Sequence, residues 1–482
     1  MRTRISAAAA TIAATLLLVG CVGTTAFHTT PASRPGTGGR ITTPAVDGKA
    51  PDCYPAENDR VCISYVEFDD YGNPLNRKQM LRAVDEAVGA IEQDGVVLVF
   101  AHGWHNDARP CPNLKAEDCT RDVKQFIEMV QRVGTMKQYS NRRVRGVYIG
   151  WRGDSIEAKG LTWPLSMLGT FWDRKAAAHQ IGSGGGVYEL LSRISEARRA
   201  NGNARLLVHG HSFGAAIVYS ALSNHLMDQI RRDERSRSTA AAAKAESMGQ
   251  EAVRQDREVQ PFADLVLLLN PAFEAMRLRP QLDLARSQQY PQGAKGEDDS
   301  ALPPRLVVLT TDADWATRRM FPLGRSISSL FDSYVDEQAA AENRTAIGHH
   351  IPYITHQLVA VDSCPEAAAP RTPGSVSSRS TLCFPARYAV SGPTPKAVQL
   401  TRCDHDRSCT AVAGAHFLER GSPKEGKVPY RMPILNIRTN ASVSTGHNDV
   451  RDGALENFML SLMELAATDS TWIPSAVGGQ AR

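Results

Sequence analysis

Residues Ala204–Ala216 read ARLLVHGHSFGAA and decide the fold. The stretch opens with a short apolar run that predicts a buried strand, and Gly214–Ile230 then carries apolar residues at helical spacing. Between them lies GHSFG, a G-x-S-x-G pattern at a turn from strand to helix. Such a turn holds Ser212 in a sparsely populated backbone conformation and projects its hydroxyl beyond the sheet. Because side chains at the flanking positions would collide with backbone, Gly210 and Gly214 are needed there.

Strand-like and helical stretches alternate along most of the chain. Arg77–Glu92 has the apolar stripe of a helix that packs on a sheet. Short apolar runs separated by helices predict strands that are buried on both faces. The pattern predicts an α/β fold, with a mainly parallel central sheet flanked by helices, in one domain over about residues 58–470. The predicted strands are Val61–Phe68, Val96–Ala101, Val144–Trp151, Ala204–His209, Leu265–Leu269, Arg305–Thr310 and Ile434–Thr439.

Two segments of this domain lack the alternating pattern and are expected to be insertions. Residues 231–260 are charged and Ala-rich, which favours a solvated helix or a mobile flap. Residues 364–431 hold four cysteines and many Pro, Ser and Thr, which favours an irregular excursion. Residues 471–482 are expected to form a C-terminal tail.

A second motif, HGWHN, begins at His102, directly after a predicted strand. Acyl transfer needs two backbone N–H donors directed at the oxyanion. Phe213, which follows the serine, can supply one of them. We expect Trp104 to supply the other, because Gly103 lets the chain turn closely. In the alternative interpretation, His102 and Trp104 only pack the loop.

HGW after one strand and GHSFG after a later one resemble the α/β-hydrolase superfamily over most of residues 58–470. A closer likeness is to poorly characterised bacterial hydrolases that also carry a GWRG segment, here residues 150–153. The resemblance implies an α/β-hydrolase fold with a Ser-His-Asp triad. Ser212 would be the nucleophile, Gly210 and Gly214 would form its elbow, and the acid and the histidine would follow in that order.

The resemblance places the acid after the next-to-last core strand and the histidine after the last. The predicted strand that ends at residue 310 is followed by TDADWAT, in which Asp314 is favoured over Asp312 because it lies deeper in the loop, before a predicted helix. The strand that ends at residue 439 is followed by a loop containing TGHND, which makes His447 the expected base. His356, in the segment IGHHIPYITH, is the alternative base.

The first twenty residues are expected to be a targeting signal, since two arginines precede an uncharged apolar run too short for a comfortable membrane span. The run ends in LVGC at residues 18–21, which resembles the lipobox of bacterial lipoproteins. That resemblance implies lipidation of Cys21 and a membrane anchor in the cell envelope. The outer membrane, facing the periplasm, is favoured because Val22 rather than Asp follows. An ordinary secretory signal is the alternative. Residues 21–57 are expected to be a flexible tether.

Cysteine spacing supports export. Apart from Cys21, eight cysteines lie in neighbouring pairs, which predicts disulfides in an oxidising compartment, although other pairings stay open. The predicted pairs are Cys53/Cys62, Cys111/Cys119, Cys364/Cys383 and Cys403/Cys409.

Composition and charge exclude several classes of protein. The chain has 55 basic and 51 acidic residues, without the concentrated basic face of a nucleic-acid binder. Histidines near strand ends lack the local spacing of a metal site, so we expect neither a metal nor a cofactor. These histidines are His102, His105, His209 and His211.

The combined features predict an anchored serine hydrolase that cleaves small-molecule carboxylic esters through an acyl-enzyme. An ester is favoured over an amide because esters dominate the resembling family and leave more easily. The alternative is a catalytically inactive hydrolase fold that serves as an envelope binding module.

Overall fold

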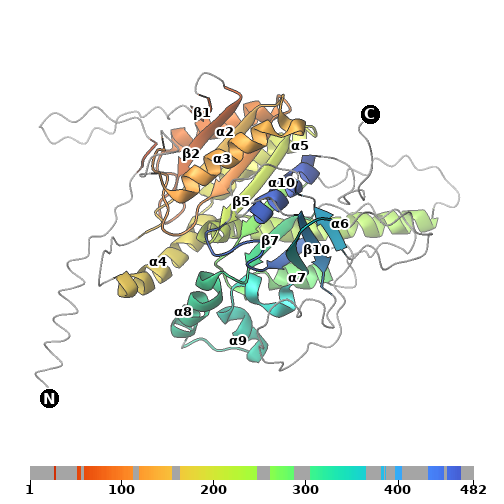
Figure 1. The fold of residues 1–482 in the computed structure, drawn as a ribbon. Coiled ribbons are helices and arrows are strands. Elements are labelled where there is room, and N and C mark those ends of the chain that lie inside the picture. The colour runs from red at the N-terminus through yellow and green to blue at the C-terminus, as the bar shows by residue number, and fades with distance from the viewer. Residues whose placement is uncertain are drawn as a thin grey trace, which may run out of the picture.

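The structure is a computed structural model that describes residues 26–28, 51–55, 59–111, 119–154, 163–246, 261–286, 304–329, 331–364, 381–384, 386, 397–403, 433–449 and 453–467. In this part of the chain, eleven strands form one mixed sheet. Helices cover both of its faces (Figure 1). The predicted α/β class with a mainly parallel sheet is therefore confirmed.

The centre of the described sheet consists of eight parallel strands. In sheet order they are β2 (Val61–Glu67), β4 (Val144–Gly150), β3 (Val96–Ala101), β5 (Arg205–His211), β6 (Leu265–Leu269), β7 (Leu306–Thr311), β11 (Ile434–Thr439) and β8 (His356–Val361). Every residue from the first six of these strands is buried, because helices cover both faces. Antiparallel strands extend the two edges: β1 (Asp52–Cys53) beside β2, and β10 (Ala397–Arg402) with β9 (Thr381–Phe384) beside β8.

The helices divide between the two faces. One face carries α2 (Arg77–Ile91), α5 (Gly186–Ala200) and α6 (Phe213–Glu246), with α4 (Trp163–Ser183) and α7 (Arg279–Arg286) packed against α6. The other face carries α3 (Arg121–Thr135) and α10 (Gly453–Ala467). The helices α8 (Phe321–Ser328) and α9 (Glu337–Arg344) lie together after the carboxyl end of β7 (Figure 1).

All seven predicted strands form within two residues of their predicted ends. The first part of the predicted insertion 231–260 continues α6 as far as Glu246, and the remainder lies outside the described residues. The prediction that 364–431 is irregular is wrong in part, because β9 and β10 lie within it and extend the sheet. β9 is a four-residue strand at the edge of the sheet, and β10 mixes polar with apolar residues, so neither shows the continuous apolar run of a central strand.

Part of the predicted tether packs on the folded body. The backbone N–H groups of Phe27 and His28 donate to the carboxylate of Glu67, at the end of β2, over 2.9 to 3.1 Å. The His28 ring stacks on Tyr65 with centroids 3.8 Å apart, and its Nε2 lies 2.5 Å from the carbonyl oxygen of Ala108. Burial raises the pKa of Glu67 to about 7, although the two N–H donors oppose it.

Disulfides form at two of the predicted pairs, Cys53–Cys62 and Cys111–Cys119. Cys364 and Cys403 are also disulfide-bonded. The side chains of their predicted partners, at positions 383 and 409, lie outside the described part of the chain.

The predicted targeting signal, the lipidation site Cys21 and the C-terminal tail all lie outside the described residues. Among the helices that the structure does describe, none is both long and apolar enough to span a membrane.

Candidate active site

The turn from β5 to α6 forms a tight elbow around the serine. Ser212 has a backbone φ of +55°, in the left-handed region that residues other than glycine rarely adopt. A Cβ on Gly214 would lie 2.0 Å from the carbonyl oxygen of Ala101 and 2.4 Å from that of His102. A Cβ on Gly210 would lie 2.6 Å from the carbonyl oxygen of Gly214. The two glycines therefore permit the close backbone approach that holds the serine in its strained conformation.

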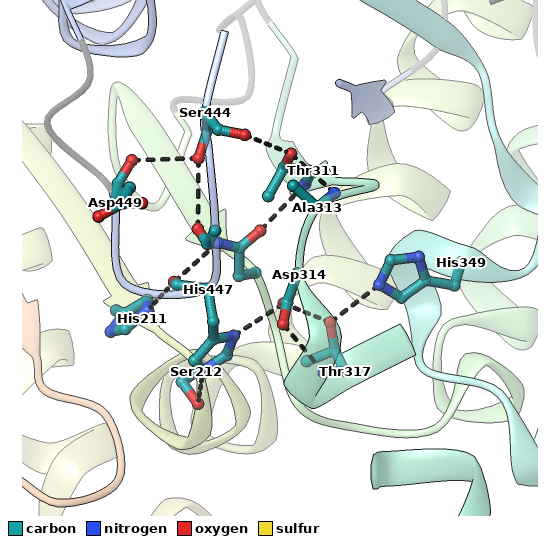
Figure 2. A network of polar contacts seen from close by, with 12 residues as sticks. His211, Ser212, Thr311, Ala313, Asp314, Thr317, His349, Ser444, His447 and Asp449 are labelled. Carbon is teal, nitrogen blue, oxygen red and sulfur yellow. Dashed lines mark hydrogen bonds and ion pairs between the residues drawn. The ribbon is translucent and has the colours of Figure 1, made fainter. Parts of the chain in front are cut away.

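Loops after two neighbouring strands bring a histidine and a carboxylate to this serine. Because β7 and β11 are adjacent and parallel, the loops at their carboxyl ends lie at one edge of the sheet, together with the end of β5. The Oγ of Ser212 lies 2.8 Å from Nε2 of His447, and Nδ1 of His447 lies 2.7 Å from Oδ2 of Asp314 (Figure 2). With Nδ1–H donating to the carboxylate, Nε2 is left to accept the serine proton. The three residues selected from the sequence thus form one hydrogen-bonded chain.

Asp314 is fully buried and held on its other side by Thr317. The backbone N–H of Thr317 donates to Oδ1 over 3.0 Å, and its hydroxyl donates to Oδ2. The Thr317 hydroxyl in turn accepts a hydrogen bond from Nε2 of His349 at 2.9 Å (Figure 2). Burial opposes ionisation of the carboxyl, but the electrostatic attraction of His447 and the hydrogen bonds from His447 and Thr317 outweigh it and hold the pKa of Asp314 at about 2. The carboxylate is therefore charged throughout the neutral range.

The alternative acid and base have other partners. Asp312 accepts from Nε of Arg438 over 2.5 Å, at the carboxyl ends of β7 and β11. His356 lies at the start of β8, where its Nδ1 is 2.9 Å from the hydroxyl of Thr355. The structure thus brings Asp314 and His447, rather than these two alternatives, to the serine.

The two expected oxyanion donors lie on segments that contact each other. Phe213 begins α6, and the loop after β3 carries Gly103 and Trp104. A Cβ on Gly103 would lie 3.0 Å from Cβ of Ser212, so this loop passes directly against the serine, and the rings of Trp104 and Phe213 are 6.0 Å apart. Within the described residues, no acceptor pairs with the backbone N–H of Phe213 or of Trp104. Both N–H groups are available to an oxyanion.

His102 fixes the loop that carries Gly103 and Trp104 through hydrogen bonds to Trp151 and Gly103. Its Nε2 accepts from the backbone N–H of Trp151 at 3.0 Å, its carbonyl oxygen accepts from the Trp151 indole at 2.9 Å, and its Nδ1 donates to the carbonyl of Gly103 at 2.9 Å. Burial lowers the pKa of His102, in keeping with a ring whose Nε2 accepts while its Nδ1 donates. The tryptophan of the GWRG segment therefore supports the HGW loop, and His102 has the packing role that the sequence left open for it.

The four histidines weighed as metal ligands have separate partners. His102 contacts Trp151, while His105 lies 2.5 Å from a carboxylate oxygen of Asp154. Burial lowers the pKa of His209 to about 3, although its hydrogen bond with the backbone of Val99 opposes the shift. His211 lies between Asp122 and the His447 backbone. Over the part of the chain that the structure describes, no group of three or more His, Cys, Asp or Glu side chains is arranged to hold a metal ion.

Three residues of the site were not singled out from the sequence: Thr317, Asp122 and Asn270. Asn270 donates from Nδ2 to the carbonyl oxygen of His447 at 2.9 Å, and its Oδ1 accepts from the N–H of Thr311 at 3.1 Å. Its place directly after the apolar run LVLLL was the one available signal. Asp122 has the pattern of an ordinary acidic residue in the first turn of a helix.

Comparisons with protein-family models, with curated proteins and with solved structures found no match to this chain.

Proposed function

We propose that the protein is a serine hydrolase that cleaves carboxylic esters through an acyl-enzyme. The observation that carries the proposal is the hydrogen-bonded chain from Ser212 through His447 to Asp314, with its serine on a strained strand-to-helix elbow. The same strand-to-helix elbow and the order serine, acid, histidine support an α/β-hydrolase fold.

The geometry supports a two-step reaction. Oγ of Ser212 attacks the ester carbonyl carbon while its proton moves to Nε2 of His447, and the N–H groups of Phe213 and Trp104 stabilise the oxyanion. As the tetrahedral intermediate collapses, His447 gives that proton to the leaving alkoxide oxygen, which departs as the alcohol. A water molecule then attacks the acyl-serine, His447 accepts its proton, and the carboxylic acid leaves as Oγ recovers a proton from His447. Charged Asp314 stabilises the imidazolium in both steps.

An ester is proposed over an amide because an alkoxide leaves more readily than an amine, and because esters dominate the family that the motifs resemble. The lipobox-like residues 18–21 and the disulfides support an anchored position in the cell envelope, on the periplasmic side of the outer membrane. The enzyme would be attached to the membrane through acyl chains on Cys21. It would meet a small-molecule ester there.

The test compares Ser212→Ala with a matched variant, Ser220→Ala. Ser220 also contacts a histidine, because its Oγ lies 2.9 Å from Nδ1 of His179, but it lies inside α6, away from any elbow. Wild type and Ser220→Ala are expected to react with a fluorophosphonate probe and to hydrolyse short acyl 4-nitrophenyl esters, whereas Ser212→Ala does neither. If the folded wild type resisted the probe and hydrolysed no ester, the alternative of an inactive binding module would replace the proposal.

A further inference from the structure

The backbone of the proposed base is held by two side chains from other strands. The carbonyl oxygen of His447 accepts from Nε2 of His211 at 2.9 Å and from Nδ2 of Asn270 at 2.9 Å. His211 ends β5 and Asn270 follows β6 (Figure 2 shows the contact from His211). The loop that carries the base is therefore fixed to the sheet at the residue whose ring must meet the serine.

The other side of His211 connects to the opposite loop of the site. Its Nδ1 lies 3.4 Å from Oδ2 of Asp122, a buried carboxylate in the first turn of α3. The same Oδ2 accepts from the backbone N–H of Gly103 at 2.8 Å. Gly103 immediately precedes Trp104, the proposed oxyanion donor. One carboxylate and one imidazole thus span the distance from the oxyanion loop to the backbone of His447.

The geometry favours an ion pair between His211 and Asp122. Both ring nitrogens of His211 face acceptors, so both must carry a proton for the ring to serve both contacts. Burial lowers the pKa of His211, but the neighbouring Asp122 carboxylate outweighs it and raises the pKa overall. Burial likewise opposes the charge on Asp122, yet His211 and the N–H of Gly103 hold its pKa at about 2. A buried ion pair whose partners are also hydrogen-bonded fixes geometry more strictly than neutral groups do.

We propose that Asp122 and His211 are positioning residues, which hold the oxyanion loop and the His447 loop in register against Ser212. The inference rests on the proposed function. Neither residue takes part in bond making, since His447 is the group in contact with the serine hydroxyl. Their role is to keep the imidazole and the Trp104 N–H where the transition state needs them, because a displacement of about 1 Å at a reacting group costs roughly 100-fold in rate.

Two substitutions at His211 separate its two contacts in the full-length protein. His211→Asn keeps a donor near Asp122 but cannot reach the His447 carbonyl, whereas His211→Gln keeps a donor toward that carbonyl and loses the charge. Because Asn270 still holds the carbonyl, we expect His211→Asn to lower kcat by about 10- to 100-fold with KM nearly unchanged. His211→Gln is expected to lower kcat by less than His211→Asn does. Asp122→Asn combined with His211→Asn is expected to lose about as much as the worse single variant, since the two act as a unit.

The matched control is Asp264→Asn, which lies at the amino end of β6, away from the carboxyl ends that carry the site. The Asp264 carboxylate is also largely shielded from solvent, with 8% of its side chain exposed; it is paired with Arg198 at 2.6 and 2.8 Å and accepts from the N–H of Leu206 at 2.7 Å. The Asp264→Asn variant is expected to lower the melting temperature as much as His211→Asn does, but to leave kcat unchanged. Wild-type kcat in folded His211→Asn, or an equal loss of kcat in Asp264→Asn, would overturn the inference while leaving the proposed function in place.

Hydrogen exchange monitored by mass spectrometry provides a readout that does not depend on activity. We expect His211→Asn to speed exchange in residues 102–106 and 444–449 together, and Asp264→Asn to leave both segments as in wild type. If wild type hydrolysed no ester, the proposed function would fail, and this exchange pattern would still decide whether the pair holds the two loops. Unchanged exchange in His211→Asn would contradict the inference on its own.

Discussion

Gly214→Ala tests the elbow at the point where the structure leaves least room. The new Cβ would lie 2.0 Å from the carbonyl oxygen of Ala101, and an ordinary contact begins at 3.4 Å, so β3 and the elbow must separate by about 1.4 Å. The strand that moves leads directly into Gly103 and Trp104. The shift therefore separates the proposed oxyanion donor from Ser212 by more than the roughly 1 Å that costs about 100-fold in rate.

We expect Gly214→Ala to lower kcat/KM on a short acyl 4-nitrophenyl ester by at least about 100-fold. The overpacked site is expected to lower the free energy of unfolding by about 1 to 3 kcal/mol, measured by urea denaturation. Gly89→Ala is the matched control, because a Cβ at Gly89, inside α2, meets nothing within 4 Å. That variant is expected to gain about 0.5 to 1 kcal/mol and keep its kcat/KM. A folded Gly214→Ala with wild-type kcat/KM would refute the elbow geometry.

The remaining predictions concern the acid, the docked N-terminal segment and a buried cation. Asp314→Asn should lower kcat by about 1,000- to 10,000-fold, measured on the same ester, whereas Asp312→Asn should keep wild-type kcat because it loses only the contact with Arg438. Since the pKa of Asp314 is lowered to about 2 in the folded state, its contribution to stability should be present above pH 4 and be lost as the pH falls toward 2, and acid titration of Asp314→Asn should lack that loss. The pKa of Glu67 is raised to about 7, so its contribution should be lost as the pH rises from 4.5 through 7; if Glu67→Gln showed the wild-type pH dependence of melting temperature, the assignment would be wrong. Arg174 is fully buried and donates to both carboxylate oxygens of Asp70. Arg174→Met is expected to lower the free energy of unfolding by about 3 to 5 kcal/mol, measured by urea denaturation, because it removes one partner of a buried ion pair. A loss under about 1 kcal/mol would contradict a stabilising role for this pair.

The central sheet could be predicted from the sequence because burial on both faces leaves a local signature. Runs such as VVLVFA at β3 and LVLLL at β6 are continuously apolar, and each is bounded by turn or helix signals. The antiparallel strands β9 and β10 carry no such signature, since β9 is a four-residue edge strand and β10 mixes polar with apolar residues. The contact of Phe27 and His28 with Glu67 could not be predicted from the sequence either, because Glu67 lies about forty positions away and the contact is made largely by backbone donors.

Some residues of the site could likewise be predicted from the sequence, and others could not. Ser212 follows from a local motif, and Asp314 and His447 follow from that motif together with the order of residues in the resembling family. Asp122 and Asn270 could not be found by either route, because their contacts with His211 and His447 span 89 and 177 positions in the chain. Only the folded arrangement of strand ends brings such groups together.

The most direct measurement is a crystal structure of the protein after reaction with a fluorophosphonate. Displacement of fluoride should leave phosphorus bonded to Oγ of Ser212, with the phosphonyl oxygen about 2.7 to 3.1 Å from the backbone nitrogens of Phe213 and Trp104. Nε2 of His447 should remain within hydrogen-bonding reach of the adduct. An unmodified Ser212, or a phosphonyl oxygen directed away from both nitrogens, would contradict the account.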